Sequence, residues 1–356
     1  SVDHLDLHSV PTRRSSDLTK TTGVATVLQT AKTPYTWEVD NFLAPPKSEL
    51  VVYELLVRDF VAKHDYQTLI DTLDYLKRLG INAIELMPFN EFEGNSSWGY
   101  NPNFYFAPDK YYGPENDLRR FIDECHKHGI AVIMDMVLNH SFGTSPMVML
   151  YWDAANNRPA ENNPWFNPVP KHDFNVGFDF NHESPDTKEL VNRVVKFWIE
   201  NYKIDGYRFD LSKGFTQKNT LNNPNAWGLY DASRIAIWKA IADTIWSVNP
   251  NAYVILEHFA ENAEEKVLAN YGMMIWGKMS DEYANAAKGN STSNNFNWAS
   301  YKARGWNEPN LISYMESHDE ERIMYRILKE GSVANPAYRT RDTTIALQRV
   351  QLANVF

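Results

Sequence analysis

Four apolar runs of this sequence end in acidic side chains and histidines, where buried strands would end. In the run within 203–214, Arg208 and Asp210 stand two positions apart, so their side chains point to the same face of a strand. A guanidinium beside a carboxylate keeps the carboxylate ionised and fixes its direction. Taken alone, this pair is explained equally well by a structural ion pair at a strand end.

The other three runs repeat this pattern of an apolar strand followed by acids and histidines. If the side chains had only structural roles, four such endings in one chain would have to be a coincidence. The endings are Asp135, Asn139 and His140 in 135–140, Glu257 and His258 in 254–259, and Glu316, His318 and Asp319 in 314–322.

Strand-like and helix-like patterns alternate along the chain, which predicts parallel β/α units. Seven strands are expected, over 50–60, 81–88, 130–140, 204–211, 252–259, 273–279 and 311–319. Helices are expected over 66–80, 116–129, 184–203, 232–248, 263–272, 320–331 and 341–356, and a further helix is expected to start over 282–288. Ser184 and Pro185 stand at the N-cap and first turn of one of them.

In this order and spacing, the four runs resemble the four short conserved regions of the α-amylase family, glycoside hydrolase family 13. GINAIELMP (80–88) and WGYNPNFYFAPDKYYG (98–113) resemble that family's second strand and the loop after it. The resemblance covers about residues 50–356, and the sequence over this range is most similar to bacterial α-amylases. It implies an α/β fold, the TIM (β/α)8 barrel, which needs eight strands to close. With seven strands counted, we expect a barrel truncated after about seven β/α units; a natural seven-unit barrel is the alternative.

This resemblance also predicts the division of the chain into segments. Residues 1–18 contain HSVPTRRSSDL, which resembles the translation of a sequencing adapter, so we expect a non-native segment; a basic linker is the alternative. The polar stretch 19–48 is expected to be a linker or the tail of a lost upstream module. Residues 49–356 are the expected incomplete catalytic barrel. Within them, 141–183 is an inserted loop or small domain after the third strand.

The resemblance implies that Asp210 is a nucleophile, that Glu257 is a general acid/base, and that Asp319 grips sugar hydroxyls. A retaining glycosidase needs two carboxyl groups about 5–5.5 Å apart, one to attack and one to donate a proton. Arg208 would keep Asp210 ionised, and the apolar run around Glu257 would raise the pKa of that carboxyl.

Further residues are expected around the acids. Tyr100 would stack under the sugar, Asp135 would support Arg208 from the neighbouring strand, and Trp98 is a candidate stacking platform. Packing in the core is the alternative for the aromatic and histidine side chains. The expected substrate-binding set is Tyr100, His140, Arg208, His318, Trp98, Lys213 and His258.

A calcium ion is a further expectation from the resemblance. Asn139 matches a family position that binds calcium through oxygen, and Asp179 matches another. Gly214 stands where many amylases have a histidine whose carbonyl completes the site; a backbone carbonyl needs no side chain, so the site stays open.

Composition narrows the classes of partner. The net charge of −10 argues against a nucleic-acid partner, and no apolar run is long enough to span a membrane. One cysteine allows no disulfide within the chain. Aromatic residues make up 13% of the chain, which suits either a sugar-binding cleft or a large core. We expect a monomer that is secreted, periplasmic or on the bacterial cell surface.

We therefore expect retaining, endo-acting hydrolysis of α-1,4-glucosidic bonds in starch- or glycogen-type glucans. Two alternatives remain inside the same family, a debranching enzyme of the pullulanase type and a glucan-branching enzyme. A non-catalytic glucan-binding barrel is the alternative outside enzymes, although all three acids are present.

Overall fold

The computed structural model describes residues 33–289, 294–330 and 339–353. The expectation for 1–18 and the first part of that for 19–48 lie outside these residues. The chain divides into two compact units, Ser1–Glu264 and Glu265–Phe356, each of which is described by itself. No helix in the described ranges is long and apolar enough to cross a membrane.

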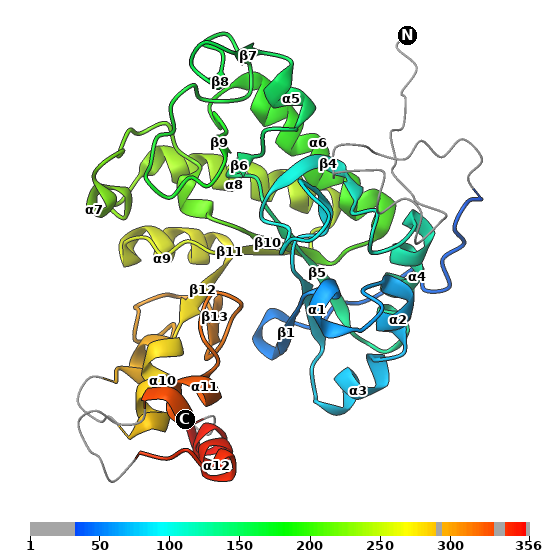
Figure 1. Cartoon of the computed structure of the whole chain (residues 1–356), viewed down its shortest axis with the longest axis vertical. Coiled ribbons are helices and arrows are strands. Elements are labelled where there is room, and N and C mark those ends of the chain that lie inside the picture. Colours follow the sequence, from blue (N-terminus) through cyan, green and yellow to red (C-terminus); the bar gives the residue numbers. More distant parts are fainter. Residues whose placement is uncertain (1–32, 290–293, 331–338, 354–356) are drawn as a thin grey trace. The chain divides into compact units, whose positions relative to one another are not determined.

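The first unit is built on five parallel strands that neighbour one another in chain order (Figure 1). They are β1 (Val52–Leu55), β2 (Ala83–Leu86), β5 (Ala131–Met136), β10 (Gly206–Phe209) and β11 (Tyr253–Leu256). Every residue of β2 and β5 is buried, as expected for parallel strands covered on both faces. Gly206 is required at the start of β10, because a Cβ there would lie 2.4 Å from the Tyr253 carbonyl oxygen.

Helices on the outside of this sheet follow the order of the strands. α2 (Tyr66–Ile70) packs on α4 (Glu115–Lys127), α4 packs on α6 (Pro185–Tyr202), and α6 packs on α8 (Ala232–Val248). The buried residues of α4 include Leu118, Phe121, Ile122 and Cys125, which form one stripe at helical spacing.

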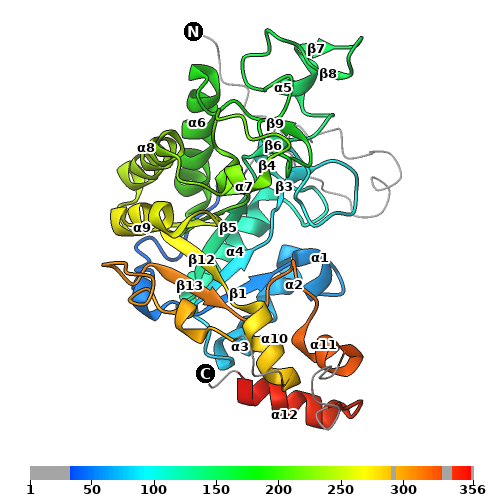
Figure 2. The same cartoon turned by 90° about the vertical axis from the view of Figure 1, so that its left-hand side faces the viewer.

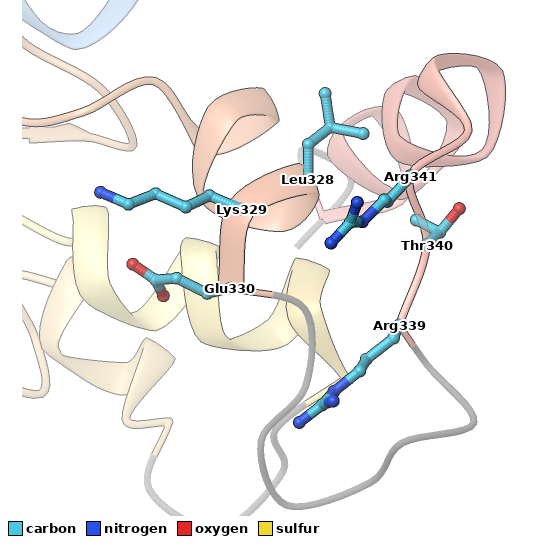
Figure 3. A pocket seen from close by; sticks show the side chains of 6 residues that line it. All are labelled: Leu328, Lys329, Glu330, Arg339, Thr340 and Arg341. Atoms are coloured by element: carbon cyan, nitrogen blue, oxygen red, sulfur yellow. The ribbon is translucent and has the colours of Figure 1, made fainter.

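The second unit has a parallel pair of strands, β12 (Met274–Lys278) and β13 (Leu311–Tyr314). Its helices α10 (Ser280–Lys288), α11 (Ile323–Glu330) and α12 (Thr343–Ala353) share a small apolar core. A pocket of about 340 Å³ beside α11 is lined by charged side chains; Lys329 points away from Arg339 and Arg341 (Figure 3). These parallel strands, five in one unit and two in the other, confirm the expected α/β fold of the TIM-barrel type.

The elements differ in places from those expected. The strand expected over 50–60 ends at Leu55, and Val57–Phe60 forms a short helix, α1. The helix expected over 66–80 is split into α2 and α3 (Leu73–Arg78), since the Thr72 hydroxyl donates back to the Leu69 carbonyl at 2.7 Å. The remaining short elements are η1 (Lys47–Glu49), η2 (Ser212–Gly214), η3 (Phe296–Ala299), α7 (Pro224–Trp227) and α9 (Asn262–Tyr271).

The segment between the expected second strand (81–88) and the expected helix over 116–129, a loop by the resemblance, contains an antiparallel hairpin of β3 (Asn90–Phe92) and β4 (Pro102–Pro108). The inserted segment 141–183 is also more regular than a loop. Its two ends pair as β6 (His140–Ser141) and β9 (Phe178–Asp179), so the chain leaves and rejoins the barrel at one place. Between them lie α5 (Pro146–Met149) and a small hairpin of β7 (Trp152–Asp153) and β8 (Arg158–Pro159) (Figure 2).

The described part of the expected linker, 33–48, is fastened to the barrel. The Asp123 carboxylate on α4 accepts hydrogen bonds from the Tyr35 hydroxyl and from the backbone N–H groups of Glu38 and Val39, each at 2.9 Å. Ser184 occupies the N-cap position of α6, but its hydroxyl donates to the Pro164 carbonyl instead of capping the helix.

His182, near the end of the inserted segment, is buried close to the end of β5. Its Nε2 lies 2.9 Å from the Leu138 carbonyl, and its ring stacks on Phe215 at 3.7 Å. Burial lowers the pKa of His182 to about 3, so the folded protein holds the neutral ring.

We therefore expect His182 to make the fold acid-sensitive. Below pH 6.5 the unfolded chain takes up a proton that folded His182 refuses, so stability falls as pH drops from about 6.5 towards 3. Between pH 7 and pH 5 this amounts to about 2 kcal/mol. In urea unfolding followed by tryptophan fluorescence, His182→Gln should lose less stability over that range than the wild type. Parallel losses in both proteins would contradict this account.

Candidate active site

Arg208 lies at the centre of the candidate site. It is fully buried on β10, and the parallel register places it beside Asp135 on β5. Its Nη1 donates to Asp135 Oδ1 at 2.9 Å and to Asp210 Oδ1 at 3.0 Å, while its Nη2 lies 3.1 Å from Glu257 Oε2. Carboxylates from three neighbouring strands thus meet at one guanidinium. Asp135 contacts Arg208 from the neighbouring strand, as its sequence position predicted.

Asp210 and Glu257 stand just beyond the last residues of β10 and β11, and each keeps only 7–8% of its surface exposed. Leu211, the next residue after Asp210, has a left-handed backbone (φ 45°), and its N–H donates to Glu257 Oε2 at 2.9 Å. Glu257 therefore contacts a cation and a backbone donor, and these two contacts fix the direction of its carboxyl group. The apolar surroundings expected from its sequence are not what its carboxyl group meets.

Tyr100 is tied to the same cluster. Its hydroxyl donates to Asp135 Oδ2 at 2.6 Å, and its ring centre lies 6.0 Å from the Arg208 guanidinium. Burial and the neighbouring Asp135 raise the pKa of Tyr100 well above its usual value. Trp98 is 46% exposed, and Gly99 beside it is required because a Cβ would lie 2.0 Å from the Pro88 carbonyl oxygen.

His140 and His258, both expected to bind sugar, lie in the protein interior. His140 Nε2 lies 2.8 Å from the Tyr100 carbonyl, and the Asn139 amide lies 3.2 Å from its Nδ1. Burial lowers the pKa of His140 to about 4, so the neutral ring donates to the loop that carries Tyr100. The ring nitrogens of His258 contact Ser212 and Glu264. These contacts hold the loops around the site, and the sugar-binding role expected of the two histidines stays a prediction.

Lys213 is partly exposed and lies beside Trp227, a loop tryptophan expected either to stack on sugar or to pack in the core, and beside two phenylalanines that the sequence pattern did not single out. Its Nζ donates to the Phe259 carbonyl at 2.9 Å and lies 4.1 Å from the centre of the Trp227 ring. Trp227 stacks on the exposed ring of Phe174 at 4.9 Å. Phe174 and Phe259 are isolated aromatics in sequence, so no local pattern could have identified them.

His318 and Asp319 belong to the second unit. His318 Nε2 lies 3.2 Å from Asp319 Oδ1, and the Asp319 side chain is half exposed. The role expected for these two residues beside Asp210 stays a prediction.

The two expected calcium ligands converge on a histidine. His172 Nε2 lies 3.1 Å from Asn139 Oδ1 and 3.8 Å from Asp179 Oδ1. A Cβ on Gly214 would lie 1.8 Å from Asn139 Oδ1 and 2.7 Å from His172 Nε2, so the Gly214 backbone packs directly against both side chains. The imidazole thus stands between the two oxygens that were expected to hold the ion.

The chemistry of these donors does not fit calcium. Calcium takes six to eight oxygen ligands, and its carboxylates must be ionised. Burial raises the pKa of Asp179 to about 7 and lowers that of His172 to about 4. Asp179 Oδ1 has no hydrogen-bond partner, but Oδ2 accepts from Asn167 and from the Lys171 N–H. Among the described residues, no group of three or more His, Cys, Asp or Glu could hold a metal ion.

Comparison with known proteins gives one matching family model and a set of similar curated proteins. Residues 40–177 match the family model described as "Alpha amylase, catalytic domain". Malto-oligosyltrehalose trehalohydrolase of Saccharolobus solfataricus is 31% identical over 177 residues, which are 49% of this chain and 30% of the relative. Isoamylase 1 of Arabidopsis thaliana chloroplasts is 31% identical over 235 residues, 56% of this chain and 29% of the relative. The chain therefore spans about 30% of the length of each of these two relatives.

Solved structures share the fold. The catalytic module of SpuA, a multi-modular glycogen-degrading pneumococcal virulence factor, aligns with a TM-score of 0.64 at 22% identity. The alignment covers 90% of this chain and 49% of the module. At this identity the likeness supports the barrel fold alone.

We expect calcium to leave the stability of the chain unchanged. A ligand that binds only the folded state raises stability in proportion to ln(1 + [L]/Kd), so a calcium site would raise the melting temperature. Because His172 stands between Asn139 and Asp179, exchange of 1 mM CaCl2 for EGTA should shift the melting temperature by less than about 1 °C. A fall of several degrees in EGTA would contradict this expectation.

Proposed function

The chain belongs to the α-amylase family, glycoside hydrolase family 13, and we propose that it hydrolyses α-1,4-glucosidic bonds of starch- or glycogen-type glucans with retention of configuration. The observation that carries the proposal is the ion pairing of Asp210 and Glu257 with the two terminal nitrogens, Nη1 and Nη2, of the buried Arg208 guanidinium. Retaining enzymes need two carboxyl groups about 5–5.5 Å apart, whereas inverting enzymes need room for a water molecule between theirs. Two carboxylates paired with one guanidinium favour the closer arrangement.

Asp210 is the nucleophile in this proposal. Arg208, which Asp135 holds in place, keeps Asp210 ionised at the C-terminal end of β10, the end at which barrel enzymes carry their chemistry. It attacks the anomeric carbon and forms a glycosyl–enzyme ester while the bond to the departing sugar breaks.

Glu257 is the general acid and then the general base. It protonates the departing oxygen in the first step, and in the second it takes a proton from the water that cleaves the ester. Asp319 would bind sugar hydroxyls, and Tyr100 and Trp98 would stack on sugar rings.

Cleavage of α-1,6 branch points is the second candidate. It is supported by the WGYNP loop at 98–102, which resembles that of pullulanases, and by the similarity to an isoamylase. The preference for α-1,4 or α-1,6 bonds depends on the side chains around the acids. It must therefore be measured with different substrates, because the carboxyl pair does not determine it.

The wild type should release reducing ends from soluble starch. Asp210→Asn and Glu257→Gln should each lower the rate by about 10²- to 10⁴-fold, because each removes one of the two reacting groups. Asp186→Asn, the same change at an exposed position in the first turn of α6, is the matched control and should leave the rate unchanged.

A panel of substrates separates the alternatives. Faster cleavage of pullulan than of starch would favour debranching. A change in iodine staining without new reducing ends would favour branching, and amylose binding without turnover would favour a non-catalytic barrel. A folded wild type, shown by a sharp melting transition, that releases no reducing ends from any glucan would overturn the proposal of hydrolysis.

A further inference from the structure

A second buried polar cluster lies next to Glu257. Its members are Ser212, His258, Glu264 and Arg234, and each is no more than 1% exposed. They come from η2, from the residue after Glu257, from α9 and from α8. None of them can contact a glucan directly, so their effect on a reaction must pass through another residue.

The cluster is a continuous chain of hydrogen bonds. Ser212 Oγ lies 2.8 Å from His258 Nδ1, and His258 Nε2 lies 2.7 Å from Glu264 Oε1. Arg234 completes the chain, because its Nε and Nη2 donate to the two oxygens of Glu264 at 2.6 and 2.8 Å. A bidentate pair of this kind fixes the carboxylate in one orientation.

The protonation of the chain follows from this pairing. Burial opposes the charge of Glu264, but hydrogen bonds from His258 and Arg234 outweigh burial and lower its pKa. Ionised Glu264 is an acceptor only, so His258 Nε2 carries a hydrogen. Burial lowers the pKa of His258, so the Nδ1 of the neutral ring is an acceptor and shares the single hydrogen of the Ser212 hydroxyl with the Glu257 carbonyl.

Ser212 connects this chain to Glu257. Its hydroxyl oxygen lies 2.7 Å from the Glu257 carbonyl oxygen, and its backbone N–H donates to the same carbonyl at 3.1 Å. The preceding residue, Leu211, donates its N–H to the Glu257 carboxylate. The turn at 211–212 therefore grips Glu257 at its backbone and at its side chain, and His258 fixes the hydroxyl of that turn.

We propose that Ser212 and His258 are positioning residues that direct the Glu257 carboxyl group at the departing oxygen of the glycosidic bond. The inference rests on the proposed role of Glu257 as general acid. Proton donation requires a particular direction as well as a particular residue, and a misplacement of about 1 Å can cost 10²-fold in rate. Loss of the Ser212 hydroxyl should thus weaken proton donation by Glu257, while the nucleophilic attack by Asp210 stays unaffected.

Leaving groups of different basicity test this. The dinitrophenolate group of a dinitrophenyl maltooligoside departs without a proton, whereas the sugar that departs from an unsubstituted maltooligosaccharide needs one. Ser212→Ala should lower kcat/KM for the maltooligosaccharide at least about tenfold, and for the dinitrophenyl substrate by less than about twofold. His258→Gln, a second variant that is needed if Ser212→Ala does not fold, should show the same selectivity.

Two controls interpret the result. Ser184→Ala removes a hydroxyl that also donates to a backbone carbonyl, but at the start of α6, and should change neither rate. Glu257→Gln sets the scale, since loss of the acid itself must affect the maltooligosaccharide far more than the dinitrophenyl substrate.

The outcomes separate the two proposals. If Glu257→Gln is selective but folded Ser212→Ala and His258→Gln slow both substrates equally or neither, the positioning role is wrong and the general acid stands. If Glu257→Gln is not selective, or if the folded wild type cleaves neither substrate, the proposed function fails and the positioning role fails with it.

Discussion

The bonding of three carboxylates to Arg208 is the interaction on which the candidate site depends. A fully buried guanidinium loses its hydration, and only close, well-directed anions offset that cost. Asp135, Asp210 and Glu257 supply them from three neighbouring strands, and they raise the pKa of Arg208 further although burial opposes its charge. Removing one partner of such a cluster typically costs about 3–5 kcal/mol, so the same contacts specify both the fold and the chemistry.

The parallel sheet makes this meeting possible. Register places Arg208 beside Asp135 on one side and Ile255 on the other, so the strand ends that carry Asp210 and Glu257 emerge together. Left-handed residues follow closely at both ends, Leu211 with φ 45° and Phe259 with φ 47°. Neither is a glycine, so the surrounding contacts must hold this strained backbone. One such turn aims a backbone N–H at the Glu257 carboxylate.

Sequence patterns predicted the strands and the strand-end acids because both depend on local order. Burial on two faces requires long apolar runs, and the barrel enzymes' chemistry lies at the strand ends. The β3–β4 hairpin was missed, since its pairing across 90–108 is irregular and its residues do not alternate cleanly. The split of the 66–80 helix depends on one threonine hydroxyl, which has no periodic signature.

The directions of individual side chains could not be predicted in the same way. His140 and His258 follow strands as expected but turn inward, because their partners Tyr100 and Glu264 come from other segments. His172 stands 33 positions from Asn139, and only the folded insertion brings the two together. The arrangement of these three histidines is a property of tertiary contacts, which a single sequence read for motifs does not contain.

The most direct test of the account is to trap its covalent intermediate. A 5-fluoro-α-glycosyl fluoride glycosylates a retaining enzyme's nucleophile and leaves it slowly, so peptide mass spectrometry can locate the sugar. We predict an adduct on the peptide that carries Asp210, absent in Asp210→Asn, together with a product of α configuration. An adduct on another carboxylate, or a β-configured product, would contradict the assignment of the Arg208-bound pair.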